Sequence, residues 1–408
     1  MLADLPHPSD RRLALRVTPD GMRHIRAGHP WLFDHSLTHV SHEGAPGDLA
    51  VVFDDERAFA AIGLWDPTSP LRVKILHHGK PTRVDRTFWS ARLSEATARR
   101  ASVLALGDTT GVRCINGEND GFPGLVLDRY DRTLVMKLYT AAWVPHLADL
   151  VAVIDEQFHP EALVLRLARN IAPEHLHGLE EGDALLGTCP TDPVLFLEHG
   201  LTFEADVVRG QKTGHFLDQR DNRAYLGTLV EGRRVFDVFA STGGFSVHAA
   251  AGGATEVVAV DLSAPTLAAA GRNMRHNLHL PMVAACTFTP IVGDAFVEMD
   301  KLLPKGKFDV VIIDPPSFAQ RQLDVPKALA AYASLTEKGV RLVKPGGLLV
   351  QCSCSSRVTA VDFHSTVARA AARVGRPLEE LRRTTHAADH PVTFPEGAYL
   401  KAVFAVVN

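Results

Sequence analysis

Four short polar clusters follow apolar runs in the second half of the 408-residue chain, and each contains groups that could bind or activate a ligand. They begin at Asp237, Asp261, Gly293 and Asp314. Strands that alternate with helices form a parallel sheet, and ligands bind beyond the carboxyl ends of its strands. Because each cluster lies at the end of a predicted strand, the four together predict a single ligand site.

The first two clusters have residue types that suit a nucleoside cofactor. The segment Asp-Val-Phe-Ala-Ser-Thr-Gly-Gly-Phe starts at Asp237 and contains Thr242 and Gly243, where glycine allows close backbone approach and a turn into a helix N-terminus. Asp261 ends the next strand, where it can accept hydrogen bonds from ribose hydroxyls and disfavours the 2′-phosphate of NADP. A simple glycine turn or a helix-capping aspartate would give the same pattern, so neither cluster alone identifies a cofactor.

The other two clusters combine an acid with an aromatic ring. Asp294 and Phe296 could hold the amino group and the face of an adenine. In Asp-Pro-Pro-Ser-Phe, which starts at Asp314, the two prolines stiffen the loop, and the aspartate and phenylalanine can meet a flat, hydrogen-bonding base. This pattern at a strand end indicates methylation of a planar nitrogenous group.

The elements that must position these clusters alternate from about residue 200. Apolar runs at residues 233–239, 257–261, 310–314 and 348–352 predict buried strands. Ser263 is the expected N-cap of the second intervening helix, with Pro265 in its first turn, and a further helix is expected over residues 325–342. We therefore predict a parallel, doubly wound α/β sheet in residues 191–408.

Two smaller domains are expected upstream. Short strands separated by turn residues predict a small β-rich domain in residues 1–79. Residues 80–190 read as a central α+β domain, with helices near 87–106 and 145–157 and strands at 111–116, 125–128, 133–138 and 162–166.

Composition excludes several classes of protein. The chain is 46% hydrophobic and 22% charged, as in folded soluble proteins, and its net charge of −4 argues against a uniformly basic nucleic-acid coat. No apolar run is long enough to span a membrane, so no membrane association is expected. Five cysteines in so long a chain are not a disulfide framework and fit a reducing cytoplasm, and the scattered histidines predict no metal site.

Two local basic segments stand out against this charge. Residues 80–100 hold six Lys or Arg and two acids, which indicates either a solvated helix face or an RNA-tracking surface. Arg26 lies close to the aromatic residues Trp31 and Phe33. The first domain could read RNA through them or could be a protein-interaction module.

Residues 200–408 resemble the class I methyltransferase domain of the RlmI family, bacterial 23S rRNA cytosine-5 methyltransferases. The resemblance rests on the string Gln-Lys-Thr-Gly-His-Phe-Leu-Asp-Gln-Arg-Asp-Asn-Arg at 211–223, on Thr-Gly-Gly-Phe, on Asp-Pro-Pro-Ser-Phe and on the segment 390–401. Upstream, residues 28–33 resemble the family's PUA domain and residues 117–124 its central linking domain. Ser241 departs from the family, which often has tyrosine there.

The resemblance implies a Rossmann-like methyltransferase domain after a PUA-like and a central domain, S-adenosylmethionine as cofactor, and large-subunit ribosomal RNA as partner. It leaves a homodimer open. Cofactor-binding residues carried over from the family are Lys212, Phe216, Gln219 and Arg220, and a cation such as Arg220 could meet the methionine carboxylate.

Cytosine C5 takes a methyl group only after a thiolate adds to C6, so a cysteine nucleophile is expected. The family carries it in Ser-Cys-Ser, which assigns it to Cys354, with Asp314 at the N3/N4 edge of the base. Cys352 lies two residues earlier on an extended strand and is expected on the same face, as a core residue. Ser317 stands where two-cysteine enzymes place a second cysteine, so another base or water should release the product.

Two alternatives stay open. Related Pro-Pro loops methylate exocyclic amino groups such as that of guanine, and such an enzyme would not need Cys354. A non-catalytic RNA-binding assembly factor could keep the fold without the chemistry, although Asp261, Asp294, Asp314 and Cys354 are all present.

Overall fold

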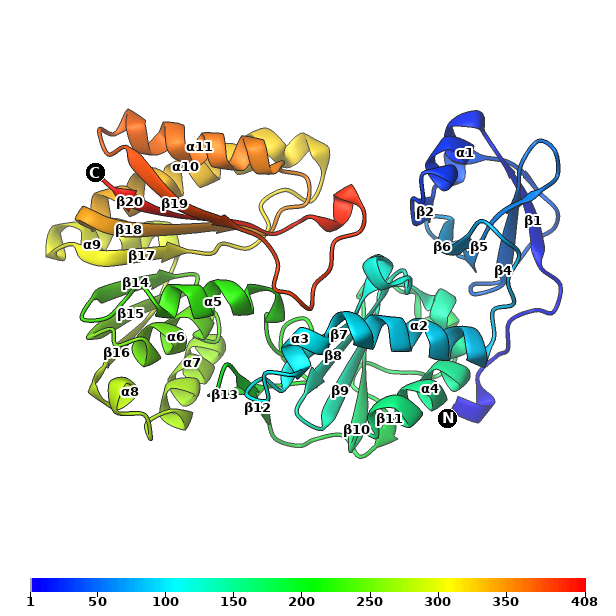
Figure 1. Ribbon diagram of the computed structural model, residues 1–408, viewed down its shortest axis with the longest axis horizontal. Helices are drawn as coiled ribbons and strands as arrows, with labels where there is room; N and C mark the ends of the chain where they lie inside the picture. The colour runs from blue at the N-terminus through cyan, green and yellow to red at the C-terminus, as the bar shows by residue number, and fades with distance from the viewer. Residues whose placement is uncertain (1) are drawn as a thin grey trace. The chain divides into compact units, whose positions relative to one another are not determined.

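The computed structural model describes residues 2–408, and the chain divides into two compact units. The first unit holds the chain up to Phe196 together with Ala205–His215 and Asp389–Phe394. The second holds Leu197–Glu204, Phe216–Ala388 and Pro395–Asn408 (Figure 1). No helix within residues 2–408 has both the length and the apolar character needed to cross a membrane.

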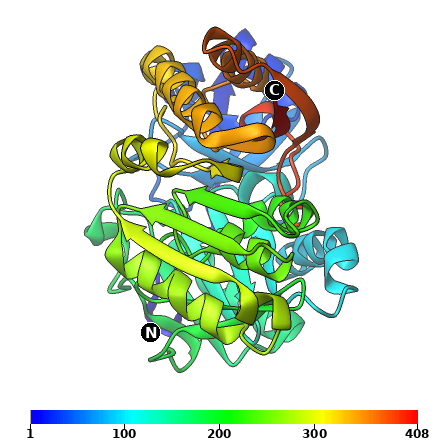
Figure 2. The same cartoon turned by 90° about the vertical axis from the view of Figure 1, so that its left-hand side faces the viewer.

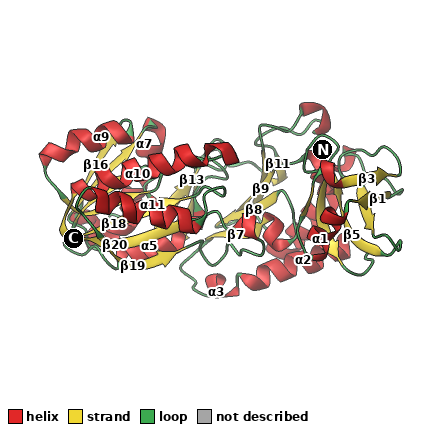
Figure 3. Ribbon diagram, turned by 90° about the horizontal axis from the view of Figure 1, so that it is seen from above, coloured by secondary structure: helices red, strands yellow, loops and turns green. Residues whose placement is uncertain are grey.

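The first unit contains two sheets, whose strands form separate groups in Figure 3. The six-stranded sheet has the order β2-β6-β5-β4-β1-β3, with bounds β1 Leu13–Val17, β2 Trp31–Leu32, β3 Leu37–Val40, β4 Leu49–Phe53, β5 Phe59–Trp65 and β6 Val73–His78. The five-stranded sheet has the order β11-β10-β9-β8-β7, with bounds β7 Gly111–Asn116, β8 Leu125–Tyr130, β9 Thr133–Leu138, β10 Ala162–Leu167 and β11 Ala184–Gly187. β12 (Val194–Glu198) and β13 (Leu201–Ala205) form a further two-stranded sheet.

One hydrophobic core joins these two sheets across the boundary predicted near residue 79. Leu64 and Leu76 of the first sheet belong to the same buried cluster as Trp89 and Trp143, which come from the region of the second sheet. The helices of this unit are α1 Pro19–Arg26, α2 Arg86–Arg99, α3 Ala101–Leu104 and α4 Leu147–Phe158. The six-stranded sheet also has a separate core of its own, which includes Leu15 and Ile25. The two sheets thus share one core but not the other, and the domain boundary stays a prediction.

The C-terminal end of the basic segment 80–100 is neither a solvated helix face nor an exposed RNA-binding surface, the two alternatives that its charge suggests. Arg100 is fully buried and makes a two-pronged contact with Asp120, with Nη1 2.8 Å from Oδ1. Arg99 also donates to Asp120 Oδ1, at 2.9 Å, and Arg92 donates to the carbonyl oxygen of Leu76 at 2.8 Å. These arginines tie helix α2 and its C-terminal end to strand β6 and to the segment 117–120. The count of charges in the sequence cannot distinguish this arrangement from a solvated helix face.

The second unit is built on a seven-stranded sheet of order β16-β15-β14-β17-β18-β20-β19. β16, β15, β14, β17 and β18 are parallel, and β20 is antiparallel to both β18 and β19. The bounds are β14 Arg234–Val238, β15 Glu256–Asp261, β16 Thr287–Val292, β17 Phe308–Ile313, β18 Val343–Ser353, β19 Leu378–Thr384 and β20 Lys401–Val407. The strand order reverses next to β14, and ligands of doubly wound sheets bind at that point.

Helices cover both faces of this sheet (Figure 2). Successive residues of β17 alternate between two cores: Val310 and Ile312 pack with α5 and α6, whereas Val311 and Ile313 pack with α9, α10 and α11. The helix bounds are α5 Arg220–Gly227, α6 Gly244–Ala251, α7 Ala264–His276, α8 Pro281–Ala285, α9 Ala295–Leu302, α10 Val325–Leu342 and α11 Ala360–Arg373. Burial on both faces explains why the central strands read as continuous apolar runs.

The predicted alternation of strands and helices is confirmed, with three differences. The Ser263 hydroxyl caps α7 as expected, and α10 has the predicted bounds. β16 has no apolar signature because most of it is exposed, and the antiparallel pair β19 and β20 was not anticipated. The third difference is that β18 begins at Val343, earlier than the predicted start at residue 348. Val343 pairs with Phe308 of β17, and the register of the two strands shifts after that pair.

The buried pair in the first unit gives a stability prediction. Asp120→Ala should lower the free energy of unfolding by about 3–5 kcal/mol, because Arg100 would remain buried without its counter-charge. Glu161→Ala is the matched control, since its partner Arg132 is 64% exposed and such pairs contribute less than about 1 kcal/mol. Urea unfolding followed by circular dichroism measures both, and equal losses would contradict the assignment.

Candidate active site

The loop after β14 is shaped by three residues with left-handed backbone conformations. Phe239, Ser241 and Gly243 have φ values of 65°, 49° and 77°. A side chain at Gly243 would place its Cβ 2.8 Å from the Cβ of Ala270 on α7, so only glycine fits there. The loop thus packs closely on α7 and leads into α6, while the half-buried Thr242 fixes it further by accepting a hydrogen bond at its carbonyl from Asn273.

Asp237 is a buried acid just before this loop. Its Oδ2 accepts a hydrogen bond from the Ser246 hydroxyl at 2.7 Å, while its Oδ1 has no donor among the described residues. Burial raises the pKa of Asp237 to about 6. A buried acceptor that lacks a donor fits an ammonium group of a bound ligand.

Asp261 ends β15 and joins the loop to the next helix. Its Oδ2 accepts from the Ser241 backbone N–H and its Oδ1 from the Ser263 N–H, both at 2.9 Å. Asp261 therefore fixes the local backbone, as a capping role predicts. Its half-buried carboxylate oxygens retain lone pairs that ligand hydroxyls could use, and ribose binding stays a prediction.

The remaining predicted cofactor residues lie in different surroundings. Asp294 is exposed and caps α9, with Oδ1 3.1 Å from the Val297 backbone nitrogen. Gln219 and Arg220 are buried, and the Arg220 Nε donates to Asp221 at 3.2 Å. Two further predicted residues are the half-buried Phe216 and the exposed Lys212, of which Lys212 belongs to the first unit.

Asp314 continues from β17 at the same edge of the sheet. Its backbone N–H lies 3.3 Å from the carbonyl oxygen of Val238, which continues the pairing of β17 with β14. Burial raises the pKa of Asp314 to about 7, and the nearby carboxylates of Asp218 and Asp237 add to the rise. A carboxyl group with this pKa can act as a hydrogen-bond donor as well as an acceptor near neutral pH.

The two neighbouring cysteines have different environments. Cys352 pairs with Ala402 in the β18–β20 ladder, is fully buried, and has a pKa raised well above its usual value by burial. Cys354 follows the last residue of β18, is half-buried, and its thiol lies 3.7 Å from the carbonyl oxygen of Pro315. The sequence predicts that Cys352 and Cys354 lie on the same face of one strand. This alternation of side chains does not extend to Cys354, because β18 ends one residue earlier, at Ser353.

A chain of hydroxyl groups connects the Cys354 loop to the Asp314 loop. Ser353 Oγ donates to the Tyr332 hydroxyl at 2.8 Å, and that hydroxyl lies 3.0 Å from Ser355 Oγ. Ser355 Oγ lies 3.1 Å from Ser317 Oγ and also accepts from the Phe318 backbone N–H at 3.2 Å. The two serines that flank Cys354 therefore hold it beside the Asp-Pro-Pro loop, a function that the motif alone did not reveal.

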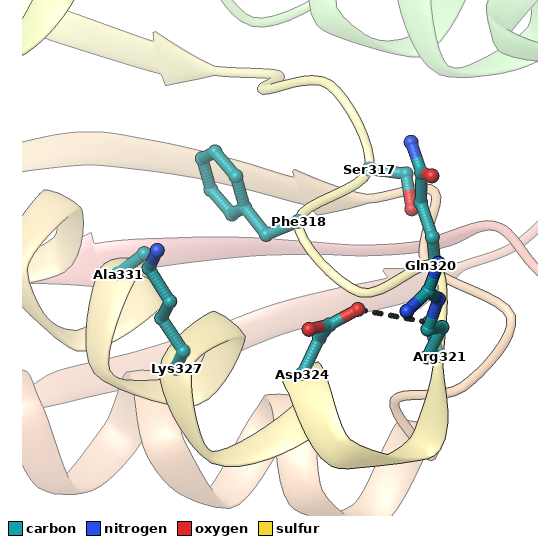
Figure 4. A pocket seen from close by; sticks show the side chains of 7 residues that line it. All are labelled: Ser317, Phe318, Gln320, Arg321, Asp324, Lys327 and Ala331. Carbon is teal, nitrogen blue, oxygen red and sulfur yellow. Dashed lines mark hydrogen bonds between the residues drawn. The ribbon is translucent and has the colours of Figure 1, made fainter.

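Two features of this region were missed from the sequence. Lys401, at the start of β20, is buried and donates to the carbonyl oxygens of Ser355 and Val358 at 2.6 and 2.7 Å. Its only sequence signal is a single charge that heads an apolar run. The second feature is a cavity of about 450 Å³ next to Ser317 and Phe318 (Figure 4).

Comparison with known proteins identifies the family. Residues 124–404 match the family model described as S-adenosylmethionine-dependent methyltransferase, and residues 15–78 match a PUA-like domain. A ribosomal RNA large subunit methyltransferase of Deinococcus radiodurans is 48% identical over 98% of both chains. A ribosomal RNA large subunit methyltransferase I of Shewanella amazonensis is 33% identical over 97% of this chain and 99% of that protein.

Solved structures share the fold. A candidate SAM-dependent methyltransferase from Streptococcus mutans covers 97% of this chain and 100% of its own, with a TM-score of 0.81 and 21% identity. A methyltransferase structure in complex with SAH has a TM-score of 0.82, at the same coverage and identity. The predicted fold class and the predicted cofactor are confirmed.

The site residues fit S-adenosylmethionine. The unpartnered Oδ1 of Asp237 suits the ammonium group of the methionine end, and Asp261 suits ribose hydroxyls. The glycine at 243 keeps the loop close to α7 and leaves no side chain in the way. Which residues contact the cofactor stays a prediction.

Asp261→Ala should weaken S-adenosylmethionine binding by about 1–3 kcal/mol, the usual loss for a hydrogen bond to a charged group. Isothermal titration calorimetry measures this loss. Because Asp261 also binds the backbone N–H groups of Ser241 and Ser263, a ribose-deoxy analogue of the cofactor serves as the control. If Asp261 binds the ribose, the variant should lose its preference for the natural ribose. Equal weakening of both ligands would leave Asp261 with a loop-fixing role alone.

Proposed function

We propose that this chain, which belongs to the family of S-adenosylmethionine-dependent methyltransferases that includes the ribosomal RNA large subunit methyltransferases I, methylates C5 of a cytosine in large-subunit ribosomal RNA. The observation that carries the proposed chemistry is the position of Cys354. It is half-buried just beyond β18, next to the Pro315 carbonyl and the loop that Asp314 begins. The names of the relatives support ribosomal RNA as the substrate.

In the proposed reaction, the Cys354 thiolate adds to C6 of the cytosine, and the electron pair of the C5–C6 bond moves to C5. The bound cofactor supplies the electrophilic methyl group. C5 then carries both the methyl group and its original hydrogen. Loss of that proton to a base re-forms the C5–C6 double bond and expels the Cys354 thiolate.

Asp314 is proposed to bind the N3/N4 edge of the cytosine. With a pKa of about 7, its carboxyl group can be protonated when the base binds, and it can then donate to N3. Such a hydrogen bond draws electron density from the ring, favours attack at C6 and stabilises the covalent adduct. The burial that raises the pKa also strengthens the bond, because the surroundings are less polar than water.

The cofactor is proposed to lie over the loop after β14. We propose that Asp237, Thr242, Gly243 and Asp261 form its binding surface, and that Asp294, which follows the neighbouring strand β16 at the same sheet edge, also contacts it. Phe216, Gln219 and Arg220 are proposed as further cofactor-binding residues by resemblance, together with Lys212. A homodimer and a cytoplasmic location are compatible with this function and remain predictions.

The two cysteines separate the proposed chemistry from amino-group methylation. Cys354→Ala should abolish methylation of 23S rRNA while S-adenosylmethionine binding persists, whereas Cys352→Ala should keep substantial activity because its thiol is part of the core. Tritium transfer from labelled cofactor measures the activity, and nucleoside mass spectrometry identifies the product. Full activity in Cys354→Ala, or methylguanosine as the product, would contradict cytosine-5 chemistry.

A mechanism-based substrate provides the independent check. RNA with 5-fluorocytosine at the target cannot lose a C5 proton, so it should trap the enzyme as a covalent adduct. Peptide mass spectrometry should map the adduct to Cys354, and the Cys354→Ala variant should form none. An adduct on Cys352 would reverse the assignment of the two thiols.

A further inference from the structure

The cavity next to the Asp314 loop has the lining of a nucleotide site. Ser317 and Phe318 lie on one wall, Gln320 and Arg321 continue the loop, and Lys327 comes from the first turn of α10 (Figure 4). Its volume of about 450 Å³ falls within the range of small-ligand pockets, roughly 300–1,000 Å³. It therefore has room for a nucleotide unit.

The charges of the cavity favour an anion. Arg321 and Lys327 are exposed and form no ion pair with any carboxylate in residues 2–408. Figure 4 shows them on opposite sides of Asp324, whose Oδ2 accepts a hydrogen bond from the Arg321 backbone N–H at 3.0 Å. Two uncommitted cations and one acid leave a local positive charge in a chain of net charge −4.

The cavity adjoins the atoms proposed to react. Ser317 Oγ lies 3.1 Å from Ser355 Oγ, and Ser355 is the residue after Cys354. The cavity wall is therefore linked by this contact to the residue that follows the proposed nucleophile. Single-stranded RNA is bound by cations that contact phosphates and by aromatic and amide groups that contact bases.

We propose that this cavity binds the RNA nucleotide next to the target cytosine, with Arg321 and Lys327 at its phosphates and Phe318 and Gln320 at its base. The proposal rests on the proposed function for the identity of the reacting base. It assigns the cavity a part in substrate binding and none in cofactor binding.

The test is the double variant Arg321→Gln/Lys327→Gln, measured by fluorescence anisotropy with a labelled single-stranded RNA and by methylation of 23S rRNA. We expect RNA affinity to fall about tenfold and the slope of log K against log salt to shrink by about 1.4, the value for two single-strand phosphates. S-adenosylmethionine affinity should not change. The matched control is Arg341→Gln/Arg369→Gln, which neutralises two exposed cations of α10 and α11 that likewise form no ion pair in residues 2–408.

Unchanged RNA affinity and salt slope, or equal losses in the control variant, would overturn the cavity proposal. RNA binding that depends on Arg321 and Lys327 in a wild-type enzyme that forms no 5-methylcytosine would uphold the cavity and overturn the proposed chemistry. The two failures are thus distinguishable.

A second and independent observation concerns Lys401. This buried lysine has no carboxylate partner among residues 2–408, and its Nζ donates to the carbonyl oxygens of Ser355 and Val358. Its backbone pairs with Ser353, the residue before Cys354. Lys401 therefore holds both ends of the turn that presents the thiol.

Cys354 is the group whose negative charge would stabilise the ammonium form of Lys401. Burial lowers the pKa of Lys401 to about 8, and the negative charge of Cys354 opposes this effect. A buried ammonium group without a carboxylate requires another compensating charge. Among the other titratable groups, Tyr332 and Cys352 feel the charges of Cys354 and Asp314. His364 feels the charge of Lys401 together with those of Arg383 and Glu380.

We infer that Lys401 is a positioning residue for Cys354, which fixes the turn at residues 353–358 and supplies the positive charge that stabilises the thiolate. The inference rests on the proposed function for the use of the thiolate. Its test does not, because thiol ionisation is measured without RNA.

The experiment is the pH dependence of Cys354 alkylation by iodoacetamide, followed by peptide mass spectrometry, in the full chain. The wild-type thiol should ionise below the ordinary pKa of about 8.5. In Lys401→Met the midpoint should rise by at least one unit, so that alkylation at pH 7 slows about tenfold, whereas Lys401→Arg should retain most of the wild-type profile. Cys286 serves as the internal reference, and His364→Phe should leave the midpoint of Cys354 unchanged.

A wild-type midpoint at or above 8.5 would overturn the inference even if Lys401→Met failed to fold. An unchanged midpoint in a folded Lys401→Met, shown by normal S-adenosylmethionine binding, would also overturn it. If the midpoint shifts as expected but Cys354→Ala still methylates RNA, Lys401 keeps its effect on the thiol and the proposed chemistry fails.

Discussion

The pairing of β17 with β14 on one side and β18 on the other is the constraint on which the site depends. Val238 pairs with Ile313, and Ile313 pairs with Gln351, so the loops that follow begin at the same edge of the sheet. A shift of one residue in either ladder would turn the buried side chains of a strand to the opposite face. The register that builds the core therefore also brings Asp314 beside Cys354.

Burial at this edge determines the chemistry of the ionisable groups. Burial disfavours the charged forms of Asp237, Asp314 and Lys401. It therefore raises the pKa of the two acids and lowers the pKa of the lysine. Such groups reduce stability unless they are paired, and shifted values cluster at functional sites. At this sheet edge the acids can therefore donate hydrogen bonds near neutral pH, and the proposed effect of the lysine is to stabilise a thiolate.

The first unit uses charge in a different way. Arg100 is buried with Asp120 and also donates to the carbonyl oxygen of Asp389, which belongs to the segment Asp389–Phe394. In the six-stranded part, the Trp31 indole donates to Glu118 and its ring meets Phe394, with centroids 5.1 Å apart. Residues that look like a nucleic-acid surface in sequence therefore hold distant segments of the chain together.

The sequence by itself determined the strands of the catalytic sheet and the groups at their ends. A strand that is buried on both faces must be apolar throughout, so β14, β15 and β17 are visible as runs, and Ser263 is visible as a cap. The motif of Cys354 and its resemblance to a family were likewise readable. Local residue types carry this information because it depends on neighbours in the chain.

Only the tertiary structure decided which charges are buried and which polar groups meet. Lys401 contacts Ser355 across 46 positions of sequence, and Arg100 contacts Asp389 across 289. The hydroxyl chain from Ser353 through Tyr332 to Ser317 exists because α10 packs on the sheet beside the end of β18. Burial and long-range contact arise from packing, and no local pattern specifies them.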